Sequence, residues 1–337
     1  MEARQESQVQ NQELKAWPKV AIIVLNWNGL KDTIECLESL KKITYPNYEV
    51  IVVDNGSKGN DADVLEEKYK DYIKVIRNKE NLGFTGGNNV AIHYAIYRKY
   101  PVDYVFLLNN DAIIEKDCLT HLVSVACKTN AGIVGAIIVE ESASERQFAG
   151  CSGNYPLIRQ FFQPLVRWPF PPHGFENDFW TCFWVSGAAM LIRKETLRDV
   201  YASTGRYLNN QLFLYGDELD FCTTARKLGY ESITTKQAIV YHPKRATSSG
   251  GKYNPVAYYY CTRNHILLAR EMLPIQLKVF FYPSNLLICL IQILKNIIYR
   301  RFYSAWAIIY GFWDAYKGVT GKWKYHDQAI LKCRGLK

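Results

Sequence analysis

The sequence has no closely spaced pair of cysteines. Its 337 residues include nine cysteines, an odd number, and no two of them form a CxxC motif. Structural zinc sites and the disulfide frameworks of small secreted proteins depend on such patterns, so neither is expected here. Because isolated, reduced thiols are typical of the cytosol, we expect a cytoplasmic protein.

The N-terminal segment lacks the apolar stretch of a secretory signal. Residues 1–14 are polar and rich in Gln and Glu, whereas a signal peptide needs an apolar region of about 7–15 residues. We expect residues 1–18 to be a polar extension that precedes the folded part. The signature of a nucleic-acid-binding module is also missing, and we expect no nucleic acid partner.

Acidic residues are scarce near the C-terminus. Residues 278–337 hold ten Lys or Arg and only two acids, Asp314 and Asp327, so they carry eight of the nine net positive charges of the chain. Such a local excess of positive charge favours an anionic surface as a partner.

The same region contains an apolar run, residues 286–298, which Pro283 precedes and Arg300 follows. Carboxamides at Asn285, Gln292 and Asn296 interrupt this run, and it is shorter than the roughly 20 residues that span a bilayer. We expect residues 271–337 to form a basic, amphipathic helical region that lies on an anionic membrane surface. Packing on the main domain or in a homodimer is the open alternative.

Three other apolar runs end abruptly in polar side chains. They are residues 19–29, 49–57 and 103–111, and the stretch 30–43 between the first two has helical periodicity. Apolar strands buried on both faces that alternate with helices predict an α/β fold, with a mostly parallel central sheet flanked by helices. Ligands of such sheets bind at the carboxyl ends of the strands.

The polar ends of these runs should therefore meet at one edge. No GxGxxG motif follows the first run, where the chain reads Asn26-Trp27-Asn28, and this excludes a dinucleotide-binding fold. A glycine-rich basic loop, which a nucleotidyltransferase would carry there, is also missing. The third run ends in Asn109-Asn110-Asp111, and a carboxylate at that edge can hold a divalent cation against phosphate oxygens.

A glycine-rich stretch, residues 78–89, leads into a predicted helix. Glycines here would let the backbone approach a ligand closely, and free amides at a helix start favour phosphate; a simple loop-to-helix junction is the alternative. Farther on, residues 155–183 predict a long loop over a cleft, residues 183–192 predict a strand, and a helix is expected from Asp217 to Leu228.

Taken together, these motifs resemble family 2 glycosyltransferases of the GT-A fold. The resemblance covers roughly residues 19–320, and its nearest subgroup is the bacterial rhamnosyltransferase-like enzymes that build surface polysaccharides. The motifs that carry it are IVLNWNG (23–29), VVDNGS (52–57), NLGFTGGNN (81–89), LLNND (107–111), VSGAA (185–189), LYGDELD (214–220), His242, and Tyr259 with Arg263-Asn264.

The resemblance implies an inverting transfer of a sugar from a nucleotide-sugar donor to a glycan or lipid-linked acceptor, in polysaccharide biosynthesis at the inner face of the plasma membrane. The first expectation is L-rhamnose from dTDP-rhamnose. UDP-galactofuranose, UDP-glucose and UDP-GlcNAc remain open, as does a catalytically inactive carbohydrate-binding homologue. The implied cofactor is a divalent cation, Mn²⁺ or Mg²⁺. The implied GT-A domain is 19–270, with a nucleotide-binding half (19–115) and an acceptor and catalytic half (116–270).

The resemblance also assigns roles to individual residues. Catalysis falls to Glu218 or Asp217, metal binding to Asp111 and His242, and acceptor binding to Trp184, Ser186 and Gly187. The expected donor-binding residues are Asn26, Asn28, Asp54, Asn55, Gly83, Gly86, Asn88, Asn109, Asn110 and Arg263.

Two positions depart from the family pattern. Asn109 stands where the family usually has the first acid of its DxD element, so the metal would lose a charged ligand, although a carboxamide oxygen can still coordinate a hard cation. Glu218 stands where the family usually has Asp as the base. Which of the two acids acts as the base is therefore left open.

Overall fold

The computed structural model of this protein describes residues 17–98, 101–141, 146–149, 151–153, 161, 178–242 and 254–333. The polar extension expected at the N-terminus, apart from its last two residues, and most of the loop expected at 155–183 lie outside this described part of the chain.

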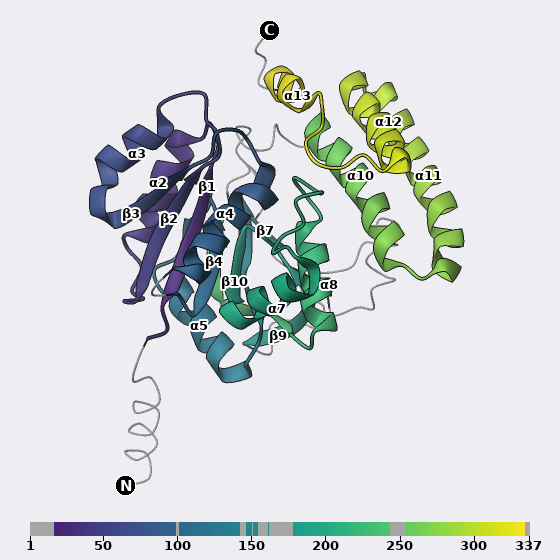
Figure 1. Cartoon of the computed structure of the whole chain (residues 1–337). Helices are drawn as coiled ribbons and strands as arrows, with labels where there is room; N and C mark the ends of the chain where they lie inside the picture. The colour runs from purple at the N-terminus through teal and green to yellow at the C-terminus, as the bar shows by residue number, and fades with distance from the viewer. Residues whose placement is uncertain are drawn as a thin grey trace.

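The N-terminal half alternates strands and helices, as predicted. Its strands run parallel in the order β3-β2-β1-β4. They are β1 (Val20–Asn26), β2 (Tyr48–Asp54), β3 (Ile73–Arg77) and β4 (Tyr104–Asn109). The helices are α2 (Leu30–Leu40), α3 (Asp61–Tyr69), the short 3-10 helix η1 (Lys70–Tyr72) and α4 (Gly83–Tyr97). These helices cover the two faces of the sheet (Figure 1).

The rest of the sheet is mixed, with the order β4-β10-β6-β11-β9-β8 continuing from the parallel half. Its strands are β5 (Ile113–Ile114), β6 (Ile133–Glu141), β7 (Arg146–Ala149), β8 (Cys151–Gly153), β9 (Phe179–Val185), β10 (Ala189–Arg193) and β11 (Ser232–Tyr241). Its helices are α5 (Cys118–Thr129), α7 (Lys194–Thr204) and α8 (Asp217–Lys227). The parallel order breaks at β10, which is antiparallel to both β4 and β6.

The single strand predicted over residues 183–192 is wrong, because the chain turns at Ser186-Gly187-Ala188. The hydroxyl of Ser186 accepts a hydrogen bond from the amide of Ala188, and the carbonyl of Ser186 accepts one from Ala189. This turn separates β9 from β10, and the two strands pair with different neighbours. An unbroken apolar composition had concealed the turn.

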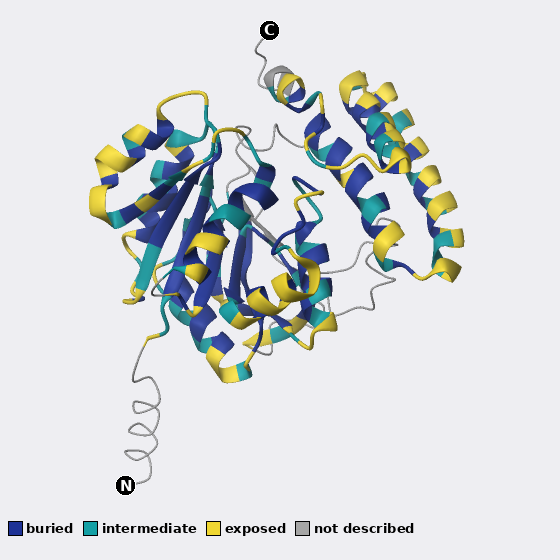
Figure 2. Ribbon diagram, viewed as in Figure 1, coloured by how far each residue is buried: buried dark blue, intermediate teal, exposed yellow. Residues whose placement is uncertain are grey.

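The core lies on both faces of the sheet, as the dark blue strands in Figure 2 illustrate. Alternate residues of β1 serve opposite faces: Val20, Ile22 and Val24 pack with α2, whereas Ala21 and Ile23 pack with α4. All five are fully buried. Because both faces of the central strands are covered, the ends of the strands are where polar side chains can gather.

Four helices follow the sheet: α10 (Pro255–Met272), α11 (Ile275–Ile298), α12 (Phe302–Lys317) and α13 (His326–Cys333). Helix α11 is longer than predicted, because it begins at Ile275 and takes Pro283 into its interior. Its 24 residues are long and apolar enough to cross a membrane, by length and composition alone. The prediction that this segment is too short to span a bilayer is therefore wrong.

These helices continue the fold. Helix α10 packs against α12, and α12 packs against α11. A buried cluster joins Phe213, from the loop before α8, to Tyr260 of α10 and to Trp323 near the C-terminus. The hydroxyl of Tyr259 donates a 2.7 Å hydrogen bond to Asp314 of α12. The C-terminal region thus shares a core with the loop that precedes Asp217.

Candidate active site

The ends of three parallel strands meet at one edge of the sheet, as the sequence predicts. Asn26 at the end of β1 is the register partner of Asp54 at the end of β2. On the other side of β1, Leu25 is the partner of Asn109 at the end of β4. A ligand above this edge would meet all three strand ends.

Asn26 forms hydrogen bonds that hold the side chains of this edge in place. It is fully buried, and its Nδ2 donates hydrogen bonds of 3.0 Å to Asp54 and 3.0 Å to Asp61, while its Oδ1 accepts one from Thr33. Donor binding was predicted for Asn26, but a side chain with these partners and no exposed surface positions Asp54 instead. Asp61 is a member of this network that the sequence did not reveal, because it starts a helix and follows no motif.

The turn after β1 closes over the same edge. Asn28 has a positive φ of 51°, its amide donates to Ser57, and its Oδ1 accepts a hydrogen bond from the amide of Lys58. It is only partly buried, as is Asn110, whose Nδ2 donates to Thr33. These two carboxamides remain placed to line a ligand site.

Asp111, His242 and Asn109 form a compact group. Nε2 of His242 lies 3.0 Å from Oδ1 of Asp111 and 3.1 Å from Nδ2 of Asn109. His242 reaches this place because it directly follows β11, where its amide donates to the carbonyl of Val139. The structure thus brings together the two predicted metal ligands, which are 131 positions apart in the sequence, with the carboxamide that replaces the usual acid.

This group has the chemistry of a cation site. A carboxylate and a carboxamide oxygen are ligands that suit Mn²⁺, and an imidazole nitrogen is a common ligand of transition metals. Within the described ranges, no three or more His, Cys, Asp and Glu side chains form a cluster that could hold a metal. The two charged or basic ligands present would therefore need Asn109 and oxygens of the substrate to complete the coordination.

The turn between β9 and β10 connects this group to the acidic pair. The carbonyl of Ala188 accepts a 3.0 Å hydrogen bond from the amide of Asn109. Its neighbour Gly187 donates its amide to Oε1 of Glu218 at 3.4 Å. A Cβ on Gly187 would lie 3.1 Å from the ring of Phe84 and 3.5 Å from Cγ of Glu218, which leaves little room for a side chain. The predicted metal ligands and the predicted base are thus linked through one short turn.

The acidic pair opens helix α8. Burial raises the pKa of Asp217 well above its usual value, and the neighbouring charge of Glu218 raises it further. Burial also raises the pKa of Glu218, while hydrogen bonds from backbone amides, including that of Gly187, act in the opposite direction. Asp217 is only 2% exposed, whereas Glu218 is half-buried. Of the two acids, Glu218 is therefore the more accessible.

Helix α10 fixes the loop before this pair. Phe213, Tyr215 and Gly216 all have positive φ angles, a conformation that costs free energy for the two aromatic residues. Nδ2 of Asn264 donates to three carbonyls of this loop, those of Leu212, Leu214 and Tyr215. These hydrogen bonds hold the strained loop and with it the start of α8.

Arg263 of α10 holds the same loop. We call Arg263 and Asn264 together the clamp. Its guanidinium is fully buried and donates to the carbonyls of Gln211, Leu212 and Gly321, and its Nε donates to Asn264. Donor binding was predicted for Arg263, but the geometry does not support it, because these groups take up its donors far from solvent. The clamp thus fixes the backbone of the loop before α8 from the side of α10.

The glycine-rich stretch packs against protein. Gly83 has a φ of +75°, and a Cβ there would lie 2.3 Å from the carbonyl oxygen of Phe213. Asn55 donates to the carbonyl of Gly83 and to Asn81 and is buried, and buried Asn88 donates to the carbonyl of Phe84. Close approach to a ligand is predicted for these residues; in this structure Gly83 contacts the loop before α8, and Asn55 and Asn88 bond to residues 81–84.

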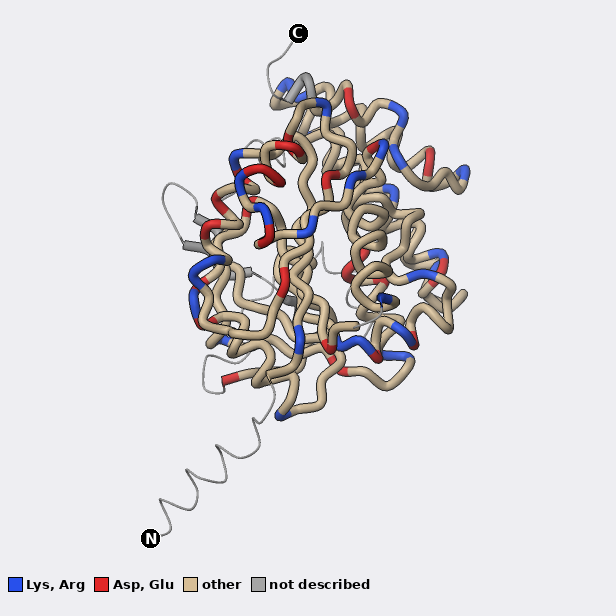
Figure 3. The backbone as a smooth tube through the Cα atoms, turned by 60° about the vertical axis from the view of Figure 1, so that its left-hand side comes forward, with Lys and Arg blue, Asp and Glu red and all other residues tan. Residues whose placement is uncertain are grey.

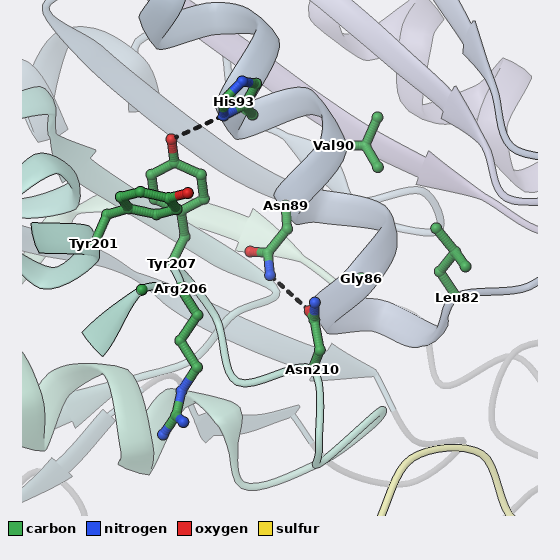
Figure 4. Close-up of a pocket in the computed structure, with 10 residues that line it drawn as sticks. Leu82, Gly86, Asn89, Val90, His93, Tyr201, Arg206, Tyr207 and Asn210 are labelled. Atoms are coloured by element: carbon green, nitrogen blue, oxygen red, sulfur yellow. Dashed lines mark hydrogen bonds between the residues drawn. The ribbon is translucent and has the colours of Figure 1, made fainter.

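Gly86 lies beside a separate hollow on the outer side of α4 (Figure 4). This hollow has a volume of about 520 Å³ and is shared by α4 and the segment 201–210. Asn89 donates to Asn210 at 2.6 Å across it, and the hydroxyl of Tyr207 lies 3.3 Å from Nδ1 of His93. Donor contact is predicted for Gly86, and in this structure Gly86 borders the hollow on α4.

The last predicted residues, Trp184 and Ser186, flank Gly187. Trp184 is half-buried at the end of β9, and Ser186 opens the turn. Trp27, at the other side of the edge, lies 5.8 Å from the ring of His326 in α13. That contact was missed by the sequence reasoning, since nothing in the residues around His326 signals a return of the chain to the sheet edge.

Comparisons with known proteins agree with this geometry. A family model described as Glycosyl transferase family 2 matches residues 21–201. The low-salt glycan biosynthesis hexosyltransferase Agl10 of Haloferax volcanii is 25% identical over 209 residues, which are 62% of each chain. An uncharacterized protein, y4gI of Sinorhizobium fredii, is 26% identical over 255 residues, 69% of this chain and 25% of its own length. The chain thus spans less than two thirds of either relative.

Two solved structures share the fold. GalNAc-T7 with UDP, GalNAc and Mn²⁺ superposes with a TM-score of 0.60 at 14% identity, over 80% of this chain and 51% of that one. The mannosyltransferase PcManGT from Pyrobaculum calidifontis, in complex with GDP-Man and Mn²⁺, gives 0.54 at 15% identity over 92% and 93%. These likenesses confirm the predicted GT-A fold.

Proposed function

This chain belongs to glycosyl transferase family 2, and we propose on that basis that it transfers a sugar from a nucleotide-sugar donor to an acceptor hydroxyl. The observation that carries the proposal is the single connected site at the sheet edge. Asp111 and His242 lie on one side of the turn at Gly187, and Glu218 lies on the other. Donor phosphates and an acceptor hydroxyl would therefore meet across that turn.

Glu218 is the proposed base of an inverting transfer. It removes the proton from the acceptor hydroxyl while that oxygen attacks the anomeric carbon, and the bond to the diphosphate breaks with its electron pair on the leaving group. The raised pKa of Glu218 suits this role, because a base is most effective when its pKa approaches the working pH. Asp217 stays buried behind it, where burial and the charge of Glu218 favour its protonated form.

Asp111 and His242, with Asn109, would hold a divalent cation, for which Mn²⁺ is our first choice. Such an ion supplies positive charge to the departing nucleoside diphosphate. Asp54, held by Asn26 and by the amide of Ser57, would accept hydrogen bonds from the base or ribose. Asn28 and Asn110 would line the same pocket, and Trp184 and Ser186 would contact the acceptor.

Our proposal for the identity of the transferred sugar is based on resemblance to the family. L-Rhamnose from dTDP-rhamnose remains the first candidate, and hexoses are the second, because one relative is named a hexosyltransferase and one structural neighbour a mannosyltransferase. Synthesis of a surface polysaccharide on the cytoplasmic side of the membrane is the setting we propose.

The C-terminal helices suggest how the enzyme would reach a lipid-linked acceptor. The outer face of α11 exposes large apolar side chains, each between 48% and 75% accessible. They are Val279, Phe280, Leu287, Leu290, Ile291, Leu294 and Ile298. Phe302, Trp306 and Trp313 continue this apolar surface on α12, and Figure 2 shows both helices yellow along their outer sides. Water is a poor solvent for so large an apolar patch.

The inner side of α11 buries two carboxamides beside two apolar side chains. Asn285 and Asn296 are 6% and 2% exposed, and Phe281 and Cys289 are also buried. A helix of a soluble protein usually exposes its polar side chains, whereas α11 buries two carboxamides and exposes most of its large apolar side chains. Lysines and arginines border this surface, and Figure 3 shows them on the C-terminal helices as well as on the sheet domain. This pattern favours an anionic bilayer over a second copy of the chain, because a protein partner would not need the basic border.

The bilayer contact we propose is in the plane of the membrane. Helix α11 lies beside α10 and α12 (Figure 1), and Asn264 of α10 holds the loop before Asp217. A spanning α11 would draw that loop into hydrocarbon, where its backbone groups would lose access to water. An in-plane α11 buries only its outer face.

Donor hydrolysis by the full-length protein tests the proposed function. A panel of nucleotide sugars is incubated with and without Mn²⁺, and the released nucleoside diphosphate is measured. We expect one donor to be turned over in a Mn²⁺-dependent manner, and Asp111→Ala to abolish that turnover while the thermal transition of the protein is kept. Hydrolysis that is equal in Asp111→Ala and the unaltered protein would refute the assignment of this edge.

A further inference from the structure

A cavity of about 300 Å³ lies between the start of α8, helix α10 and helix α11. Its walls include Tyr215 and Leu219 from the α8 side, Leu268 from α10, and Ile288 and Cys289 from α11. This volume is at the lower end of the range of ligand-binding pockets. The cavity lies where α11 faces the loop that leads into the acidic pair.

The walls carry no charge. The one histidine among them, His265, is half-buried, and desolvation lowers its pKa to about 4, so it is neutral. Its ring stacks on Phe161 at 5.4 Å, and its Nδ1 lies 3.3 Å from Nδ2 of Asn285. Oδ1 of Asn285 in turn accepts a weak hydrogen bond from Cys289. Phosphate or a sugar acid would meet no cation here.

The two carboxamides deepest in the walls already have partners within the protein. Asn264 uses its Nδ2 for three loop carbonyls and its Oδ1 for Arg263, and Asn285 is paired with His265 and Cys289. Beside Thr262 and Gln292, the cavity offers a ligand the apolar surface of Tyr215, Leu219, Leu268 and Ile288. A hydrocarbon chain gains free energy from such a surface, whereas a hydrated sugar would lose hydrogen bonds to water.

The cavity lies between the exposed face of α11 and the start of α8. Ile288 is half-buried and directly follows Leu287, which is 59% exposed on the proposed membrane face. At the other end, Gly216 precedes Asp217, and a Cβ on Gly216 would lie 3.2 Å from Leu268. The cavity thus joins the apolar outer face of α11 to the acidic pair.

We propose that this cavity holds the hydrocarbon chain of a lipid-linked acceptor, with the chain entering from the bilayer along α11 and the sugar end directed to Glu218. The inference rests on the proposed function and adds the identity of the acceptor: a lipid, recognised by its chain near the reacting end. The phosphate groups of such a lipid would stay outside the uncharged cavity.

Photolabelling tests the proposal directly. Full-length protein is bound to vesicles of phosphatidylcholine and phosphatidylglycerol that contain an isoprenyl phosphate with a photoreactive group in its chain. After irradiation, mass spectrometry locates the label. We expect it on residues that line the cavity, such as Leu219 and Leu268, in addition to those of the outer face.

Ile288→Trp is the test variant, because it fills the cavity, and Leu287→Trp is its matched control on the exposed face. We expect Ile288→Trp to reduce the labelling of Leu219 and Leu268 at least tenfold and Leu287→Trp to leave it unchanged. Equal labelling in both variants, or label confined to the outer face, would overturn the proposal. So would equal labelling by a phospholipid with the photoreactive group in its acyl chain, since the cavity would then be an ordinary bilayer contact.

Failure of this proposal can be told apart from failure of the proposed function. Donor hydrolysis is measured on the same samples, and it needs no acceptor lipid. Protein that hydrolyses a donor but shows no label in the cavity contradicts the chain site alone. Protein that is labelled in the cavity but hydrolyses no donor contradicts the transferase assignment.

Discussion

The central sheet and helix α11 distribute their polar and apolar side chains in opposite ways. In the sheet, Ile22 and Ile23 are fully buried and the polar side chains gather at the strand ends. In α11, Asn285 and Asn296 are buried, whereas Ile298 is 75% exposed. The sheet has the distribution of a domain that folds in water, whereas α11 leaves most of its large apolar side chains uncovered.

This difference assigns separate tasks to the two regions. Apolar strands covered on both faces hold Asp54, Asn109 and Asp111 in fixed positions at one edge. Helix α11 exposes an apolar side, which we propose contacts a membrane, and its buried Asn285 lies 3.3 Å from His265 of α10. The clamp of Arg263 and Asn264 joins the two, because it lies on α10 and holds the loop before Glu218.

The largest effect is expected at the sheet edge. Glu218→Gln keeps the shape of the side chain and removes its capacity to accept a proton. We predict that sugar transfer falls about 10²–10⁴-fold, the usual contribution of a general base. Steady-state rates with a saturating donor measure the loss, and Glu231→Gln, an exposed position, serves as the control. A rate that stays within a factor of two would remove Glu218 from the mechanism.

The membrane face should give the next largest effect. Replacing Leu287, Ile291 and Leu294 with Ser removes three exposed leucine-type side chains, each of which gains about 1.5 kcal/mol or more from burial in lipid. We predict at least a 100-fold loss of binding to anionic vesicles, with nearly unchanged thermal stability, because the three side chains are exposed. Vesicle sedimentation measures it. If vesicle binding is retained and the variant instead changes from a dimer to a monomer, this face is a contact between two copies of the chain.

The clamp between the two regions should show a moderate effect on stability. Asn264→Ala leaves the carbonyls of Leu212, Leu214 and Tyr215 without this donor. We predict a loss of about 2–3 kcal/mol of unfolding free energy, together with slower transfer, because the loop before Glu218 loses its support. Chemical denaturation provides the measurement, and Gln237→Ala at an exposed site is the control. Full stability with full activity would exclude a positioning role.

The smallest effect concerns pH. Burial raises the pKa of Asp220 to about 6, although Arg206 opposes the shift. The folded state then binds more protons than the unfolded state between about pH 4 and 6, so this carboxyl makes stability decrease as pH rises through that window. We predict that Asp220→Asn flattens this decrease. Unfolding free energies measured at pH 4.5, 5.5 and 6.5 test it, and an unchanged slope would contradict the prediction.

Much of the site could be predicted from the sequence because strand ends are local features. The runs that end at Asn26, Asp54 and Asn109 predicted one shared edge, and the register of the sheet places them there. The meeting of Asp111 with His242 depends on a pairing between distant strands, and only the resemblance suggested it. Neither the turn at Gly187 nor the burial of Asn26 and Arg263 has a periodic signal.

The glycine-rich stretch shows why the role of a glycine is hard to read from a sequence. A glycine that a ligand approaches and a glycine that a backbone carbonyl approaches look the same in a sequence. For Gly83, the neighbour is the carbonyl of Phe213. Similarly, Pro283 suggested a helix start, but the helix continues through it. The C-terminal boundary expected at residue 270 stays a prediction; because α12 and Trp323 share a core with Phe213, we propose that the catalytic unit extends to include them.

One comparison of binding with turnover tests the central claim most directly. Manganese-dependent binding of the nucleoside diphosphate is measured by calorimetry, and donor hydrolysis is measured in parallel, for the unaltered protein, Asp111→Ala and Glu218→Gln. The account predicts that Asp111→Ala loses both the binding and the turnover, whereas Glu218→Gln binds the nucleotide normally and loses the transfer. Normal manganese-dependent binding and turnover in Asp111→Ala would contradict it.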